Sequence, residues 1–170
     1  MDFKSYIRDI ENFPKAGVMF KDITPLLKDA NALQKSTEAL LDLIGDVKVD
    51  KVVGMESRGF FFAPLLASHL NAGFVPVRKP GKLPAKKMSQ NYDLEYGTDS
   101  LEIHEDAIKK GEKVLVHDDV LATGGTAKAT CELIERLGGE IIQCNFLVEL
   151  QFLNGSGKLN KYHLTSLVQY

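Results

Sequence analysis

The sequence predicts an α/β fold in which helices flank a mostly parallel central sheet. Segments with helical spacing alternate along the chain with short segments of strand character. The strand segments are mainly continuous apolar runs, which is typical of strands that are covered on both faces. Strand, helix and strand in this order require crossover connections, and such connections build parallel sheets.

The first half of the chain predicts a helix, a strand, a helix and a strand. Residues 30–44 form the first helix, because one helical stripe carries Leu33, Thr37, Leu40, Leu41 and Ile44. Residues 51–54, with the sequence KVVG, form a short strand. Residues 60–70 are apolar on most sides and predict a buried helix, and residues 74–77 predict the next strand.

The second half continues the alternation. Leu101 and Ile103 alternate with polar residues and predict a strand at 100–104. Residues 113–116 form a strand that delivers two acids at its end. The next helix, 127–137, stops at a pair of glycines and has one face made of Thr130, Cys131, Ile134 and Leu137. Two further strands are predicted at 140–150 and 163–168.

One long loop interrupts this pattern. Residues 79–92 are rich in Lys, Pro, Gly and Ser and have no clear periodicity. Loops of this length inside a compact domain are usually lids or disordered segments. We therefore expect a flexible lid loop here.

Composition limits the class of protein. A chain of 170 residues with 44% hydrophobic content can bury a core, so we expect a single domain spanning residues 1–170. The net charge of -2 offers no general attraction to nucleic acid or to an anionic membrane, so neither is expected as a partner. The longest apolar run, Phe60 to Ala67, is too short to span a membrane, and Pro64 interrupts it. Cys131 and Cys144 match no disulfide or zinc pattern, so we expect free thiols and a cytoplasmic location.

The stretch VLVHDDVLATGGTAKAT, residues 114–130, carries the clearest chemical signal. Asp118 and Asp119 end an apolar strand, and a helix begins soon afterwards, near Thr126. Ligands of open parallel sheets bind at the carboxyl ends of the strands. The unpaired N–H groups of a helix start favour anions at the same place.

The loop Ala122 to Thr126 therefore predicts a phosphate cradle, in which glycines permit close backbone approach and two threonines add hydroxyl donors. Two carboxylates would repel a phosphate unless a sugar diol or a hydrated Mg²⁺ lay between them. A ribose 5-phosphate meets both demands.

Competing motifs do not fit the spacing of this stretch. The chain has no G-x-x-x-x-G-K-[ST] sequence, and no G-x-G-x-x-G sequence follows its first strand. A phosphoacceptor receiver domain would place the acidic pair near the start of the chain. A ligand-free strand exit with a helix N-cap needs one polar residue, whereas this stretch supplies five.

The segment VLVHDDVLATGGTA resembles the phosphoribosyl-pyrophosphate signature of the type I phosphoribosyltransferase family. Four further blocks are similar to family members that act on adenine, in the same order: FPKAGVMFKDITPLLKD, GMESRGFFFAPLLA, VPVRKPGKLP and YDLEYGTDSLEIH. The match covers nearly the whole chain. It implies a fold with a small N-terminal hood and a lid, and a homodimer as the typical assembly. The implied reaction is adenine plus phosphoribosyl pyrophosphate giving AMP plus pyrophosphate, with Mg²⁺, in purine salvage.

The resemblance also assigns residues to the sugar phosphate and the pyrophosphate. The ribose-phosphate site would comprise Asp118, Asp119, Ala122, Thr123, Gly124, Gly125 and Thr126. The pyrophosphate site would comprise Ser57, Arg58, Arg78 and Lys79, with a cis peptide between Glu56 and Ser57. The charge excess between Arg78 and Lys87 suits this role, because that segment holds five cations and no acid. A solvated basic loop and a plain surface arginine remain the alternatives.

The base and the proton are assigned by resemblance as well. Glu95 would be the general base, and Tyr96 would line the closed site. Without the resemblance, Glu95 is simply the outward residue of an alternating strand. Phe20 would stack on adenine, beside Val18 and Lys21. Lys21 departs from the family, which usually has Arg there, so a bidentate contact at that position is in doubt.

Two expectations concern histidine and metal. His117 stands where the family commonly has an aliphatic residue, and we expect a core or dimer-facing histidine. No metal site built from side chains alone is expected. Mg²⁺ would be held mainly by substrate oxygens and water, near Asp118 and Asp119.

Two other functions would need different chemical groups. A phosphoribosyltransferase for hypoxanthine, xanthine or orotate would need hydrogen-bond donors where adenine's amino group needs acceptors. A non-catalytic regulator that senses phosphoribosyl pyrophosphate would need a basic recognition helix or an added domain.

Overall fold

The computed structural model describes residues 1–93 and 98–170. Its internal contacts divide the chain into two units, Met1–Ala39 and Leu40–Tyr170. The second unit contains the central sheet.

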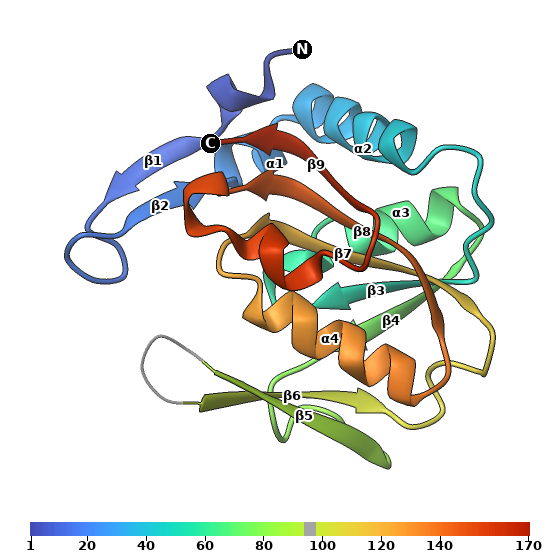
Figure 1. Cartoon of the computed structure of the whole chain (residues 1–170). Coiled ribbons are helices and arrows are strands. Elements are labelled where there is room, and N and C mark those ends of the chain that lie inside the picture. The colour runs from blue at the N-terminus through green and yellow to red at the C-terminus, as the bar shows by residue number, and fades with distance from the viewer. Residues whose placement is uncertain (94–97) are drawn as a thin grey trace. The chain divides into compact units, whose positions relative to one another are not determined.

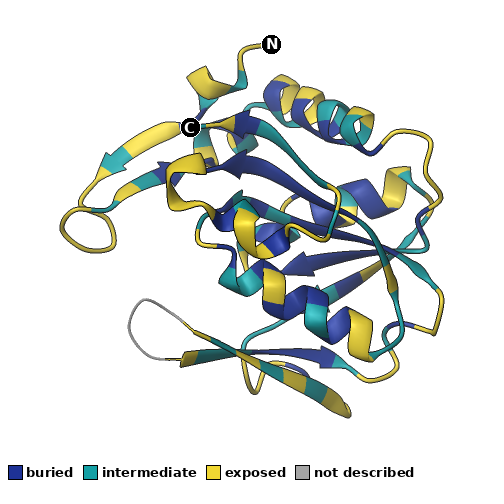
Figure 2. Cartoon of the chain, in the orientation of Figure 1, coloured by how far each residue is buried: buried dark blue, intermediate teal, exposed yellow. Residues whose placement is uncertain are grey.

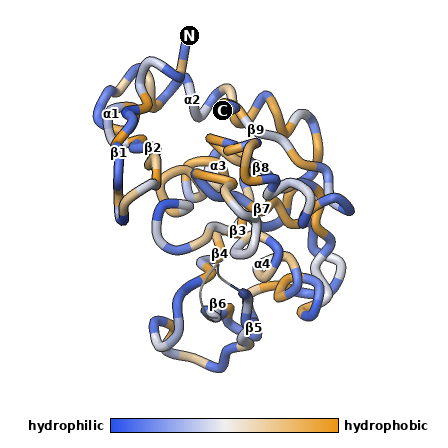
Figure 3. Tube along the Cα trace, turned by 60° about the vertical axis from the view of Figure 1, so that its left-hand side comes forward, coloured by the Kyte–Doolittle hydropathy of each residue, from blue (hydrophilic) through white to orange (hydrophobic). Residues whose placement is uncertain are grey.

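A five-stranded sheet runs through the second unit (Figure 1). Its strand order is β4-β3-β7-β8-β9, and every neighbouring pair is parallel, so the predicted parallel sheet is confirmed. The strands are β3 (Lys51–Met55), β4 (Gly73–Val77), β7 (Lys113–Leu121), β8 (Glu140–Glu149) and β9 (Leu164–Gln169). The apolar runs of β3, β7 and β8 are buried, and Figure 3 shows hydrophobic residues gathered along the sheet.

Helices cover the two faces of this sheet. Helix α4 (Gly125–Arg136) shares a buried cluster with Val53 and Val116, so it packs on their face. Helix α3 (Ala63–His69) approaches the opposite face, because a Cβ built on Gly54, the next residue after Val53, would lie 2.7 Å from the Cβ of Ala63. Figure 2 shows the buried inner side and exposed outer side of α4.

The helix predicted at 60–70 is shorter than expected. A 3-10 turn, η2 (Arg58–Phe60), comes first, and α3 begins only at Ala63. Pro64 explains the late start, because proline has no N–H to donate and is tolerated only in the first turn of a helix.

The prediction of a loop at residues 79–92 is partly wrong. Strand β5 (Lys87–Asp93) pairs antiparallel with β6 (Thr98–His104), and Tyr92 stands opposite Asp99. An isolated bridge between Arg78 and Glu102 joins the exit of β4 to β6. The strand escaped prediction because its residues are mostly polar, and β6 supplies the backbone partners that make it a strand.

The remaining elements of the second unit connect β8 to β9. These are two 3-10 turns, η3 (Gln151–Leu153) and η4 (Gly155–Leu159). Within the described part of the chain, none of the helices has the length and apolar character needed to cross a membrane.

The first unit contains a small antiparallel pair, β1 (Arg8–Glu11) and β2 (Met19–Asp22), preceded by the turn η1 (Phe3–Tyr6). Helix α1 (Thr24–Lys28) follows, and α2 (Ala30–Ile44) runs from this unit into the second. The bounds predicted for α2 are confirmed. The Asp29 side chain accepts a hydrogen bond of 2.8 Å from the backbone N–H of Ala32, which stabilises the start of α2.

Candidate active site at the carboxyl ends of the strands

The two acids lie within strand β7, not beyond its end. The apolar run predicts a strand that stops at Val116, but β8 pairs with β7 as far as Leu121, and this backbone pairing extends the strand past Asp118 and Asp119. The two carboxyl groups lie close enough to interact with each other through charge and hydrogen bonding. Asp118 is partly exposed, whereas Asp119 is 2% exposed.

The two carboxyl groups are held in a partly dehydrated environment. Arg58 forms an ion pair of 3.0 Å, Nε to Oδ2, with Asp119. Burial raises the pKa of Asp118, and the neighbouring charge of Asp119 raises it further. Burial also raises the pKa of Asp119, although Arg58 opposes that shift. Hydroxyl donors or a cation from a ligand would favour the ionised forms.

The loop from Ala122 to Thr126 lines a cavity of about 80 Å³ together with Asp118 and Phe146. Helix α4 starts at Gly125, two residues before the predicted range of 127–137, so its first N–H groups belong to this loop. A helix of this length favours an anion at its start. The five predicted loop residues and Asp118 therefore border one small space.

Two glycines permit close backbone contact between the Ala122–Thr126 loop and the turn η4. Gly124 has a φ of +76°, and a Cβ built there would lie 2.4 Å from the carbonyl oxygen of Gly155 in η4. A Cβ on Gly155 would lie 2.2 Å from the carbonyl oxygen of Ala122. Only residues without a side chain permit this backbone contact.

The segment after β3 approaches β7. The peptide between Glu56 and Ser57 is cis, as the resemblance implied, and Ser57 is exposed. Next in the chain, Arg58 reaches Asp119. A Cβ on Gly59 would lie 3.0 Å from Oδ1 of Asp118, so this segment lies directly against the acidic pair.

Glu56, which sequence reasoning missed, organises the two cations after β4. Arg78 donates to its carboxylate at 3.2 and 3.3 Å, and the backbone N–H of Lys79 donates to it at 2.9 Å. Burial raises the pKa of Glu56, but these donors outweigh burial, so the pKa lies below its ordinary value. The signal that could have identified Glu56 was its position next to Ser57, which was already assigned to the pyrophosphate site.

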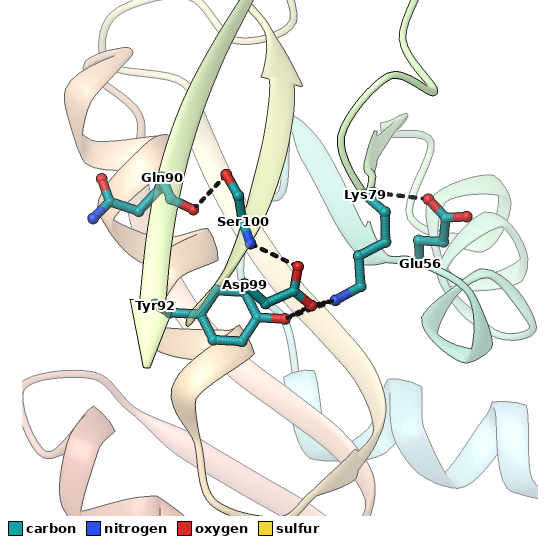
Figure 4. A network of polar contacts seen from close by, with 6 residues as sticks. All are labelled: Glu56, Lys79, Gln90, Tyr92, Asp99 and Ser100. Carbon is teal, nitrogen blue, oxygen red and sulfur yellow. Dashed lines mark hydrogen bonds and ion pairs between the residues drawn. The ribbon is translucent and has the colours of Figure 1, made fainter. Parts of the chain in front are cut away.

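The Lys79 side chain joins a second network that the sequence did not reveal (Figure 4). Its ammonium group donates to the Tyr92 hydroxyl at 2.8 Å and to the Asp99 carboxylate. Tyr92 in turn donates to Asp99 at 3.0 Å. No local signal predicted this network, because it requires the register of the β5–β6 hairpin.

Val18, Phe20 and Lys21, which are assigned to the base, lie in the first unit. Phe20 packs edge-on against Phe13, with ring centroids 4.9 Å apart, and Val18 is half-buried. Lys21 is buried and forms an ion pair of 2.6 Å with Asp9. Glu95 and Tyr96 lie outside the described residues.

His117 is fully buried, as expected for a core histidine. Its Nδ1 lies 3.0 Å from the Asn145 side-chain oxygen, and the Asn145 amide donates to Thr165 at 3.1 Å. With the Asn145 oxygen facing the ring, a neutral His117 donates from Nδ1. Burial lowers the pKa of His117 to about 4, despite the bond to Asn145.

This shift predicts a pH-dependent stability. Above about pH 6.5 the histidine is neutral in both folded and unfolded chains and has no effect. As the pH falls from 6.5 to about 4, only the unfolded chain gains the proton, so this residue lowers the free energy of unfolding by up to about 3 kcal/mol. Denaturant unfolding at several pH values measures the loss.

The matched comparison is His117→Leu against His69→Leu, since His69 is exposed. His117→Leu should flatten the acid-side slope of the unfolding free energy relative to the wild-type chain, whereas His69→Leu should not. Comparing slopes also separates His117 from the two aspartates, whose raised pKa values act in the opposite direction. An unchanged slope in His117→Leu would contradict the prediction.

The described residues contain no group of three or more His, Cys, Asp or Glu side chains arranged to hold a metal ion. Asp118 and Asp119 are the acids at the candidate site, and one oxygen of Asp118 accepts the Asp119 backbone N–H at 2.9 Å. This donor set suits a hydrated Mg²⁺ carried by a ligand better than a fully protein-bound ion.

Comparison with known proteins gives a consistent result. Residues 22–168 match the family described as "Phosphoribosyl transferase domain". The chain is 66% identical over 170 residues to the adenine phosphoribosyltransferase of Christiangramia forsetii, covering 100% of this chain and 99% of that protein.

Solved structures agree with the sequence comparison. The crystal structure of adenine phosphoribosyltransferase from Thermoanaerobacter pseudethanolicus superposes with a TM-score of 0.98 at 52% identity, covering 99% of this chain and 98% of that one. The enzyme from Saccharomyces cerevisiae, solved in complex with an imino-altritol bisphosphate and adenine, has a TM-score of 0.92 at 42% identity, covering 98% and 96%.

Proposed function

The chain belongs to the phosphoribosyltransferase family, and within it to the adenine phosphoribosyltransferases, and on that premise we propose that it converts adenine and phosphoribosyl pyrophosphate to AMP and pyrophosphate in purine salvage. The observation that carries this proposal is the small cavity of the Ala122–Thr126 loop, which lies beside Asp118 at the start of α4. A sugar phosphate needs an anion site and hydroxyl acceptors next to each other, and this edge of the sheet supplies both.

In the proposed reaction one bond forms, another bond breaks and one proton is transferred. A ring nitrogen of adenine attacks the anomeric carbon of the ribose, the bond from that carbon to pyrophosphate breaks, and Glu95 takes the proton from the attacking nitrogen. Positive charge develops on the sugar while negative charge develops on the leaving group. The Ala122–Thr126 loop holds the 5-phosphate, and Asp118 and Asp119 accept hydrogen bonds from the ribose hydroxyls.

The leaving pyrophosphate is assigned to the cations that surround Glu56 and Asp119. Arg58 and Arg78 present forked donors to its oxygens, Lys79 supplies a point charge, and Ser57 adds a hydroxyl. Mg²⁺, when bound with the substrate, neutralises part of the pyrophosphate charge. Asp118 and Asp119 are the residues that would hold the hydrated ion, by accepting hydrogen bonds from its water.

The base and the wider setting of the enzyme complete the proposal. Phe20 stacks on adenine, with Val18 and Lys21 beside it, and Tyr96 lines the closed site. Both units serve one phosphoribosyltransferase domain, which is consistent with the family match over residues 22–168.

We further propose a cytoplasmic homodimer. The two buried cysteines remain thiols 3.7 Å apart, which suits a reducing compartment, and the homodimer follows the habit of the family.

A panel of bases tests the function directly. With phosphoribosyl pyrophosphate and Mg²⁺ present, release of pyrophosphate should be at least about 100-fold faster per unit concentration with adenine than with hypoxanthine, xanthine or orotate. The reason is that a site built for an amino group leaves its acceptors unpaired opposite an oxo group. Turnover of hypoxanthine as fast as that of adenine would contradict the adenine specificity, and no turnover of any base would contradict the transferase function.

A further inference from the structure

The ammonium group of Lys79 is held by the hairpin formed by β5 and β6. Tyr92 and Asp99 stand directly opposite each other in the hairpin register, so their side chains project from the same face. Figure 4 shows both side chains directed at the tip of Lys79. Lys79 thereby links the exit of β4 to the hairpin.

Hydrogen bonds at both of its oxygens orient the Asp99 carboxylate. One oxygen accepts the Lys79 ammonium and the Tyr92 hydroxyl, and the other accepts the backbone N–H of Ser100 at 2.8 Å. The hydrogen bond from Lys79 lowers the pKa of Asp99, and the Ser100 N–H lowers it further, so the carboxylate is ionised at neutral pH. The Lys79 side chain is 39% exposed and that of Asp99 is 31% exposed, so a dissolved anion can reach the pair.

The network of Lys79, Tyr92 and Asp99 adjoins the Ala122–Thr126 loop. A Cβ built on Gly125 would lie 3.3 Å from the Tyr92 ring, and Gly125 also borders the cavity of the Ala122–Thr126 loop. At its other end, the backbone of Lys79 is held by Glu56. The lysine backbone is thus anchored on one side, while its charge is neutralised by an internal carboxylate.

We infer that Asp99, oriented by Tyr92, is an internal counter-ion that competes with pyrophosphate for Lys79 and so sets the affinity for substrates that carry pyrophosphate. The inference rests on the proposed function, in which Lys79 contacts pyrophosphate. An incoming pyrophosphate meets an ammonium group whose charge Asp99 already neutralises, so part of its attraction to Lys79 is offset. Asp99 acts only through Lys79 and touches no substrate.

The test is calorimetric titration of the full chain with pyrophosphate and Mg²⁺. Asp99→Asn keeps the shape of the side chain and most of its hydrogen bonds but removes the charge. Pyrophosphate should then bind about threefold more tightly, the size expected for a partly exposed ion pair. In the assay, the KM for phosphoribosyl pyrophosphate should fall by a similar factor, while kcat and the KM for adenine stay unchanged. Unchanged or weaker binding would overturn the inference.

Three further variants separate the counter-ion role from a general effect of charge. Asp99→Glu restores the charge and should return the affinity toward that of the wild-type chain. Asp93→Asn removes an exposed charge from the same end of the hairpin, so an equal gain there would mean a general field effect and would overturn the inference. In a Lys79→Met background, Asp99→Asn should have no effect, and a persisting gain would also overturn it.

The outcomes separate this inference from the proposed function. If Lys79→Met weakens pyrophosphate binding while Asp99→Asn does not strengthen it, the counter-ion role fails and the proposed function stands. If Lys79→Met binds pyrophosphate as tightly as the wild-type chain, the assignment of Lys79 fails and the inference fails with it. Loss of the proposed function would appear separately, as absence of turnover in the panel of bases.

Discussion

Replacing Gly124 by alanine is expected to weaken the binding of phosphoribosyl pyrophosphate by about 10- to 100-fold, the loss of one or two hydrogen bonds to a charged group. The new Cβ would lie 2.4 Å from the carbonyl oxygen of Gly155, which is backbone and cannot rotate away. The loop must therefore move, and under the proposed function its N–H groups should no longer converge on the 5-phosphate. The φ of +76° adds a conformational penalty, so the free energy of unfolding should also fall by about 2–4 kcal/mol.

Two glycine variants separate the contact from the backbone penalty. Gly111 has a φ of +82° with no atom within 4 Å of a built Cβ, so Gly111→Ala should lower stability slightly and leave substrate binding unchanged. Gly155→Ala makes the same backbone contact from the other side, 2.2 Å from the Ala122 oxygen, and should reproduce the binding defect. Wild-type substrate affinity in both Gly124→Ala and Gly155→Ala would contradict the phosphate role of the loop.

Replacing Glu95 by glutamine should lower kcat by about 100- to 1,000-fold, because a general base contributes about that much to a proton transfer. The amide keeps the size of the side chain but cannot accept the proton of adenine. The KM for adenine should change little, since the neutral base is recognised elsewhere. Steady-state kinetics over a range of pH should show that the acidic limb of the wild-type profile is lost in the variant.

The control for Glu95→Gln is Glu105→Gln, which removes an exposed charge just after β6 and should leave turnover unchanged. Equal losses in kcat and in adenine affinity for Glu95→Gln would indicate a binding role instead of proton transfer. The residue lies outside the described part of the chain, so this prediction rests on the family resemblance and the chemistry of the reaction.

Local sequence predicted the regular elements well where their interactions are local or their burial is uniform. Helix α2 has the predicted bounds because Asp29 caps it and one stripe of residues faces inward. The strand and helix on either side of the Ala122–Thr126 loop were also expected, since a continuous apolar run and a helical face are both legible in sequence. The length of β7 was not predicted, because β8 extends this strand by backbone pairing, which does not depend on the side chains.

The polar partners of the site residues were harder to predict. The sequence predicts that Arg58, Arg78 and Lys79 bind an anion, but it does not predict their internal partners. Arg58 pairs with Asp119, Arg78 with Glu56 and Lys79 with Asp99. Each partner comes from a different strand or strand end, and long-range pairing leaves no mark on local periodicity.

The sequence by itself determined which chemistry is present: the acids, the glycine and threonine loop, and the helix start that follow one another within residues 114–130. These interactions join near neighbours, so composition and spacing are enough. Only the tertiary structure decided which distant residues meet at the site. Gly155 contacts Gly124, and Asp99 pairs with Lys79. Those contacts bring together residues that are distant in the chain, and their meeting depends on the register of the hairpin and on the path between β8 and β9.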